Sequence, residues 1–284
     1  MLRVAIARLT LAPCLRLAAL AALAALGALP GCGARSELPV CDRGDVLECE
    51  SVCGVGVQLC VQGQWGPCSA SPPEDVIPLS ATVRDFRVDH PDFEEATIGL
   101  DPGIVEAQLG ADGKPVYAGD PTTPTTTGEA NFDQWYRDVE GVNLSAPYAI
   151  DLVSNGADPP VYRFDREGFF PIDGQLFGNE GDVHNYHFTL EMVVEFRYVG
   201  GEVFTFRGDD DLFAFINGRL AIDLGGVHST GTSTVALDSI AGAFGLTPGE
   251  VYPLALFFAE RHTTGSNFFV ETTIAEFAIC PDQD

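Results

Sequence analysis

Residues 205–218 decide the fold, and they read Thr-Phe-Arg-Gly-Asp-Asp-Asp-Leu-Phe-Ala-Phe-Ile-Asn-Gly. Three consecutive carboxylates, Asp209, Asp210 and Asp211, interrupt an apolar β pattern. Like charges repel and an unpaired buried ion costs several kcal/mol, so a strand interior does not hold three adjacent carboxylates for stability. We expect a compensating group, and Ca²⁺ is the candidate because it takes oxygen ligands.

The same stretch predicts an antiparallel hairpin. Asn-Gly is a two-residue turn that needs positive φ, and it follows the carboxylates after one strand length. With Asn217 and Gly218 as the loop, Ile216 faces Arg219 across the hairpin. Two further pairs, Phe215–Leu220 and Phe213–Ile222, then fall on one apolar face and fix the register.

The chain from residue 80 onward is predicted to be all-β. Residues 186–198 place apolar side chains at every even position, which is typical of a long half-buried strand. Further strands are expected at 203–207, 235–237, 251–258 and 268–279, and no long amphipathic helix is evident. Residues 121–128 are expected to form a polar loop. Short strands with frequent turns indicate an antiparallel β-sandwich.

Composition excludes some classes of partner. The 284 residues include 15 Lys+Arg and 41 Asp+Glu, a formal net charge of −26. Such a charge argues against nucleic acid and anionic lipid surfaces. The hydrophobic share of 46% is sufficient for a real core.

The N-terminus has the pattern of an export signal. Three arginines precede an apolar run over residues 17–29, too short to span a bilayer comfortably. The run ends in Leu-Pro-Gly-Cys at 29–32, which resembles a bacterial lipoprotein signal, although Pro30 is atypical there. This resemblance implies a signal over residues 1–31, a diacylated Cys32 and, with Gly33 rather than Asp beside it, an outer-membrane address. The alternative is ordinary cleavage near Ala34, which would leave a secreted protein.

Cysteine spacing supports export. Beyond Cys14 and Cys32, an even number of cysteines remains, which in an exported chain predicts three disulfides of open connectivity. They are Cys41, Cys49, Cys53, Cys60, Cys68 and Cys280. We therefore expect a disulfide-rich module over residues 32–68, a Pro-rich linker over 69–79 and the β-sandwich over 80–284.

Several motifs in order resemble the fibro-slime domain, over about residues 80–279. Its opening blocks are similar to Thr-Val-Arg-Asp-Phe (82–86), His-Pro-Asp-Phe (90–93), Phe-Asp-Gln-Trp-Tyr (132–136) and Gly-Val-Asn (141–143). Its closing blocks are similar to residues 206–226, continuing to His228, and to Phe-Phe-Ala-Glu-Arg-His (257–262). The second half also resembles the wider protective-antigen-type β-sandwich, which is jelly-roll-like and occurs in bacterial toxins, glycosidases and fungal flocculin adhesins.

The wider family implies a site. In its carbohydrate-binding members, two adjacent Asp residues joined by a cis peptide bind Ca²⁺, a later loop adds an Asn and backbone carbonyls, and sugar hydroxyls complete the coordination. Carried over, the pair is Asp209-Asp210 and the loop residue is Asn267. Asp211 stands where that family often has Gly, so the cis bond could instead be Asp210-Asp211. The predicted metal ligands are Asp209, Asp210, Asp211 and Asn267.

These observations favour a lipid-anchored surface protein that binds carbohydrate through Ca²⁺ in adhesion. The alternative is a structural component of extracellular slime or matrix with protein partners. A glycan hydrolase has little support, since Glu260, Arg261 and His262 lack an accompanying catalytic motif. We therefore expect no catalytic residues.

Overall fold

The computed structural model describes residues 41–42, 44–51, 54–61, 64–65, 75–94, 97–263 and 265–278, without the side chains of residues 50, 51, 54 and 61. The chain divides into two units, residues 1–71 and 72–284. Expectations for the signal, Cys32, Cys53, Cys68 and Cys280 fall outside the described residues. Within the described part, no helix has the length and apolar character needed to cross a membrane.

The first unit contains a small antiparallel sheet of β1 (Val46–Ser51), β2 (Gly54–Val61) and β3 (Gln64–Trp65). A disulfide joins Cys41 to Cys60, and Cys49 is also disulfide-bonded. So short a segment buries little apolar surface, and covalent cross-links replace the missing core. The expected disulfide-rich module is confirmed for these cysteines.

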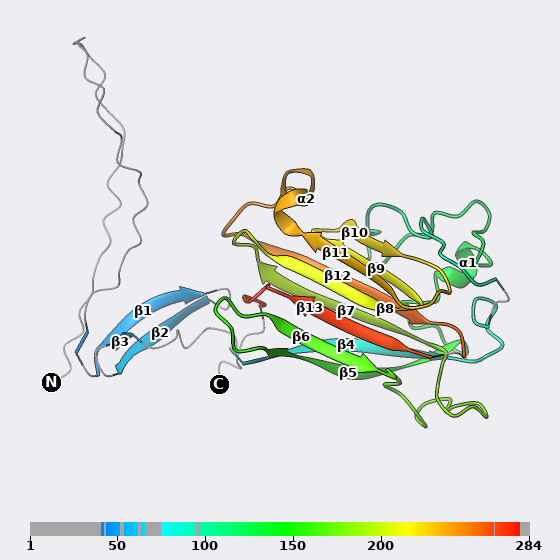
Figure 1. Ribbon diagram of the computed structural model, residues 1–284. Helices are drawn as coiled ribbons and strands as arrows, with labels where there is room; N and C mark the ends of the chain where they lie inside the picture. Colours follow the sequence, from blue (N-terminus) through cyan, green and yellow to red (C-terminus); the bar gives the residue numbers. More distant parts are fainter. Residues whose placement is uncertain are drawn as a thin grey trace, which may run out of the picture. The chain divides into compact units, whose positions relative to one another are not determined.

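The second unit is an antiparallel β structure, as predicted, built on a ten-stranded sheet in the order β10-β9-β12-β7-β4-β5-β6-β13-β8-β11 (Figure 1). Its strands are β4 (Val76–Phe86), β5 (Asn143–Ser154), β6 (Tyr162–Glu167), β7 (Phe188–Arg197), β8 (Val203–Asp209), β9 (Asp211–Ile216), β10 (Arg219–Leu224), β11 (Gly231–Ala236), β12 (Val251–Glu260) and β13 (Asn267–Thr272). The helices are α1 (Glu129–Phe132) and α2 (Leu237–Phe244).

The sheet is folded over into two layers, and the chain itself requires this. β9 is second and β8 ninth in the strand order, yet Asp210 is the single residue between them. In a flat sheet, seven strand spacings of about 4.8 Å would separate them by roughly 34 Å. The two steps from Asp209 to Asp211 can span at most about 7 Å. The carboxylate run is therefore the corner at which the chain passes from one layer to the other.

The space between the layers is filled by one large apolar cluster. Inward side chains of β7, β9 and β12, such as Leu190, Leu212 and Phe258, meet those of β8 and β13, such as Phe206 and Phe268, all fully buried. The side chains that fill this cluster occupy alternate positions along their strands, which is the period-2 pattern seen in the sequence.

A second apolar cluster covers the opposite face of β9 and β12. Phe213 and Phe257 point away from the first cluster and pack against Trp135 and Tyr136 of residues 97–142, which we call the cap. β9 is consequently buried on both faces along its whole length, and β12 from Leu254 onward. A strand so enclosed tolerates a charge only with a buried partner.

Two sequence-based expectations are corrected. The sheet starts at Val76 rather than residue 80, because Ile77 and Leu79 are core residues, so the expected linker ends earlier. In the hairpin, Ile216–Arg219 and Phe215–Leu220 pair as predicted, but Ile222 pairs with Ala214. A β-bulge after Leu220 shifts the register, so that Leu220 contacts the cap cluster and Ile222 the inter-layer cluster.

Candidate functional site

The corner between β8 and β9 opens on a pocket of about 320 Å³. Asp209 and Asp210 line it together with residues 227–230, His262, Gly265 and Ile98. The peptide bond between Asp209 and Asp210 is cis, which is one of the two alternatives left open by the sequence. The pocket thus collects two of the four predicted ligands directly.

Asn267 lies beside Asp209 because β13 pairs with β8 in a register that places these two residues opposite each other. The Asn267 backbone N–H donates to Asp209 Oδ1 at 2.6 Å, and its side-chain amide donates to Asp209 Oδ1 and Oδ2 at 3.2 and 3.0 Å. Gly208 permits this approach, since a Cβ there would lie 2.6 Å from the Asn267 carbonyl oxygen. The structure therefore brings the third predicted ligand to the same corner.

Asp210 is 6% exposed and its carboxylate has only backbone donors as hydrogen-bond partners in the described part of the chain. His228 N–H donates to Oδ1 at 3.2 Å and Arg261 N–H to Oδ2 at 3.0 Å. Burial, together with the negative charge of Asp211, raises the pKa of Asp210 to about 7. The charged form of this carboxylate is under-compensated.

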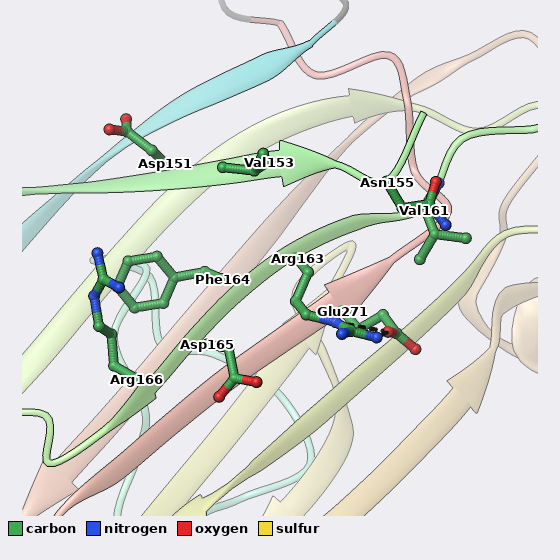
Figure 2. A pocket seen from close by; sticks show the side chains of 9 residues that line it. All are labelled: Asp151, Val153, Asn155, Val161, Arg163, Phe164, Asp165, Arg166 and Glu271. Atoms are coloured by element: carbon green, nitrogen blue, oxygen red, sulfur yellow. Dashed lines mark hydrogen bonds and ion pairs between the residues drawn. The ribbon is translucent and has the colours of Figure 1, made fainter. Parts of the chain in front are cut away.

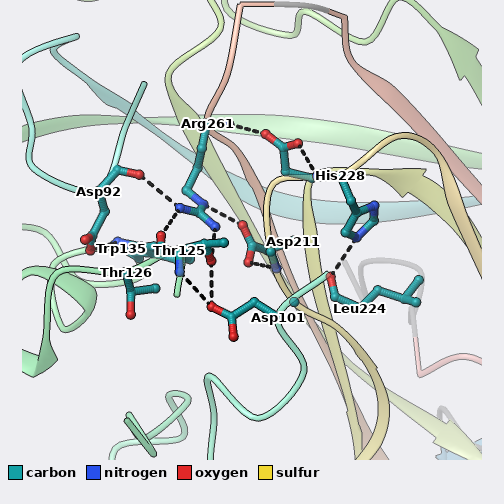
Figure 3. Close-up of polar contacts among 12 residues, drawn as sticks. Asp92, Asp101, Thr125, Thr126, Trp135, Asp211, Leu224, His228 and Arg261 are labelled. Atoms are coloured by element: carbon teal, nitrogen blue, oxygen red, sulfur yellow. Dashed lines mark hydrogen bonds and ion pairs between the residues drawn. The ribbon is translucent and has the colours of Figure 1, made fainter. Parts of the chain in front are cut away.

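Asp211 has a different environment from its two neighbours. It is fully buried, it does not line the pocket, and its Oδ2 accepts from Arg261 Nε at 2.5 Å (Figure 3). Its Oδ1 accepts from Gly226 N–H at 2.6 Å. The third carboxylate of the run is thus neutralised by a guanidinium group of this chain, and it is not among the groups that face the pocket.

Sequence reasoning missed the role of Arg261. Its side chain is fully buried, and Nη1 donates to the carbonyl oxygens of Asp92 at 3.0 Å and Thr125 at 2.7 Å. The guanidinium carbon also lies 4.7 Å from the ring centroid of Trp135. The expected polar loop at 121–128 is therefore partly buried, with Thr125 1% exposed. A buried arginine is held by the cap on one side and by Asp211 on the other.

Glu260 adds a further buried acid next to the corner. Its side chain is 1% exposed, and Oε2 has no hydrogen-bond partner among the residues the structure describes. Burial and the charges of Asp210 and Asp209 raise its pKa well above the usual range. Glu260 is therefore a second buried acid, next in the chain to Arg261, whose burial disfavours its charged form.

The corner brings potential oxygen donors together without a larger cluster of acids. No group of three or more His, Cys, Asp and Glu side chains in the described part of the chain has a metal-binding arrangement. What converges is two carboxylates and one amide, all potential oxygen donors. The Asn267 amide presents its oxygen instead of its nitrogen after a rotation of 180°.

Comparisons with known proteins found one domain model and several relatives. The PA14 domain model matches residues 174–280. The chain is 37% identical over 227 residues to Protein psiR of Dictyostelium discoideum, covering 74% of this chain and 22% of that protein. It is 38% identical over 216 residues to Protein psiD of the same organism, covering 70% and 42%. This chain thus spans about a fifth to two-fifths of the length of these relatives.

Among solved structures, the chain is similar to a PA14 sugar-binding domain from an RTX adhesin, with 12% identity, a TM-score of 0.24, and coverage of 39% of this chain and 69% of that one. It is also similar to the epithelial adhesin 9 A domain from Candida glabrata in complex with Galβ1-4GlcNAc, with 14% identity, a TM-score of 0.29, and coverage of 74% and 90%. The segment that the PA14 domain model matches includes Asp209, Asp210 and Asn267.

Proposed function

We propose that the β-sandwich binds carbohydrate through a Ca²⁺ ion held by Asp209, Asp210 and Asn267. The observation that carries this proposal is the pair of adjacent carboxylates that line one pocket, with Asn267 held against the first of them. Asp211 is outside the proposed ligand set because Arg261 already neutralises it.

Electrostatics support a cation at this position. Asp210 has a pKa of about 7 because it is buried next to Asp211. A divalent cation would supply the missing positive charge and would lower that pKa. Ca²⁺ takes about six to eight oxygen ligands, more than three side chains provide, so backbone carbonyls and sugar hydroxyls would complete the shell.

The PA14 match and the fibro-slime resemblance support the same reading, since carbohydrate-binding members of the protective-antigen-type family use an Asp-Asp pair and an Asn in this way. For the whole protein we propose an adhesive role at the cell surface. In this proposal Cys32 carries the lipid anchor at the outer membrane, with secretion as the alternative. The proposal includes no catalytic step.

Calorimetric titration with CaCl₂ tests the cation site. Wild type is expected to bind with measurable heat, and Asp210→Ala is expected to lose it. Asp182→Ala removes an exposed carboxylate outside the site and serves as the matched control. If Asp210→Ala and wild type give the same heat, the assignment of the site is wrong.

A glycan array with CaCl₂ or with EDTA tests the sugar. Retention on one or more glycans in CaCl₂, abolished by EDTA, is expected. A protein that binds Ca²⁺ and retains no glycan would instead favour the structural role in slime or matrix with protein partners. For the anchor, globomycin is expected to block maturation in the native host, and unchanged processing would exclude lipidation of Cys32.

A further inference from the structure

Outward-facing side chains of β8 and β13 form a series of pairs that begins at the proposed cation site. In β8 and β13, Asp209 lies opposite Asn267, and the next outward pair along the same strands is Arg207 and Phe269. The pair after that is Thr205 and Glu271. These residues alternate with buried ones, so all of them lie on the same outer face.

β6 extends each row by one strand. Asp165 is opposite Phe269, and Arg163 is opposite Glu271. The two rows therefore read Asp165–Phe269–Arg207 and Arg163–Glu271–Thr205 across three strands. Arginines, carboxylates, one aromatic ring and a hydroxyl alternate on this face.

The face is hollowed continuously from the corner outward. The pocket at the Asp209–Asp210 corner shares Thr230 with a hollow of about 100 Å³ that includes Asn267 and Phe269. This hollow in turn shares Asp165 and Arg166 with a groove of about 510 Å³. Figure 2 shows the side chains that line the groove, with the Arg163–Glu271 ion pair among them.

Phe269 is partly exposed and supports two arginines. The guanidinium carbons of Arg207 and Arg163 lie 4.7 and 5.4 Å from its ring centroid. Arg163 donates to Glu271 through two of its nitrogens, at 3.1 and 2.5 Å, and Arg207 to Asp165 at 3.4 Å. Stacking and ion pairing fix the orientation of the guanidinium planes, and the other N–H donors have no partner among the described residues and can reach a ligand.

Charge selects the class of ligand. The two outer hollows are lined by four carboxylates (Asp151, Asp165, Glu167 and Glu271) and three arginines (Arg163, Arg166 and Arg207). In a protein with a net charge of −26, this balance disfavours an anionic polymer. Fixed donors and acceptors in alternation match a neutral polymer whose hydroxyl groups both donate and accept.

We propose that this outer face is an extended subsite for a linear neutral oligosaccharide whose terminal sugar is held at the Asp209–Asp210 corner. The inference rests on the proposed function and specifies its ligand as a chain rather than a single sugar. From Asn267 to Glu271 the platform extends four residues along β13, about 13 Å at the rise of a strand. That distance exceeds one hexose ring, so at least one further sugar contacts Phe269 and its two arginines.

A glycan array carrying each terminal hexose both as a monosaccharide and at the end of linear tri- and tetrasaccharides, in CaCl₂, tests the proposal. Wild type is expected to bind the longer glycans about tenfold more tightly than the matching monosaccharide. Arg163→Ala and Phe269→Ala are expected to remove this advantage while calorimetric Ca²⁺ binding stays unchanged. Arg197→Ala is the control because it breaks a comparable ion pair with Glu276 elsewhere. This variant should still bind the longer glycans more tightly than the monosaccharide.

The outcomes separate the two proposals. Equal affinity for short and long glycans, or an advantage that survives in both platform variants, would overturn the extended subsite and leave the cation site standing. Retention of no glycan by a Ca²⁺-binding protein would overturn the carbohydrate function, and the subsite with it. Using two variants keeps the test decisive if one of them fails to fold.

Discussion

Arg261→Met is expected to destabilise the sandwich strongly. The side chain is completely buried, and its nitrogens donate to Asp211 at 2.5 Å, to two carbonyl oxygens at 3.0 and 2.7 Å, and to Thr125 Oγ1 at 3.2 Å. Methionine fills much of the volume but leaves the Asp211 carboxylate as an unpaired buried charge. Breaking a buried pair in this way costs about 3–5 kcal/mol of unfolding free energy.

Urea unfolding at pH 7, followed by tryptophan fluorescence, measures the loss. Trp135 is fully buried in the cap cluster and 4.7 Å from the Arg261 guanidinium carbon, so its emission reports on this region. Arg87→Met is the matched control, because Arg87 also stacks on a ring, 4.0 Å from that of Phe177, but is 53% exposed. Arg87→Met is expected to lower the free energy of unfolding by at most about 1 kcal/mol.

The double variant Arg261→Met/Asp211→Asn separates charge from packing. Asparagine keeps an acceptor for the Gly226 N–H and removes the orphan charge, so the double variant is expected to be more stable than Arg261→Met alone. If Arg261→Met lowers the free energy of unfolding no more than Arg87→Met does, the conclusion that the Arg261–Asp211 ion pair holds the cap to the sheet is refuted.

Three further predictions concern Asp210, Asp85 and Gly208. Because the pKa of Asp210 is about 7, protons compete with Ca²⁺, and calorimetric affinity is expected to fall by up to about tenfold per unit below pH 7; equal affinities at pH 5.5 and 8 would contradict this. Burial raises the pKa of Asp85 to about 6, above its value of 3.8 when exposed, so the folded state binds the extra proton and stability falls as pH rises from about 4 to 6. In urea unfolding, Asp85→Asn should lack this decrease, and parallel pH profiles of variant and wild type would count against it. Gly208→Ala places a Cβ against the Asn267 carbonyl oxygen, so it should lower stability by about 1–3 kcal/mol and weaken Ca²⁺ binding, whereas unchanged values would show that β8 and β13 need not approach so closely.

Local patterns predicted much of the fold. Period-2 alternation identified β7, and the Asn217-Gly218 turn located the hairpin of β9 and β10. The hairpin register was right up to Leu220 and wrong beyond it. The bulge lets Leu220 and Ile222 contact different apolar clusters, and the cap that forms one of these clusters is distant in sequence.

The candidate site was predicted in part. The resemblance to a known family selected Asp209, Asp210 and Asn267, and the structure brings these residues to one corner. The resemblance gave no indication that Asp211 pairs with Arg261. The pairing of β9 with β12, which puts Asp211 opposite Ala259, brings together residues 50 positions apart.

The sequence by itself determined that the chain is β-rich, where the hairpin turns, and that three adjacent carboxylates need compensation, because these properties depend on alternation, turn chemistry and charge within a few residues. Only the tertiary structure decided which of the three carboxylates is neutralised within the chain and which two line the pocket. Folding the sheet into two layers makes the carboxylate run a corner, so that Asp211 faces the buried Arg261 while Asp209 and Asp210 face the pocket. Asp209 ends β8, Asp210 lies between the strands and Asp211 begins β9, so the three carboxylates meet different surroundings, and distant segments supply those surroundings.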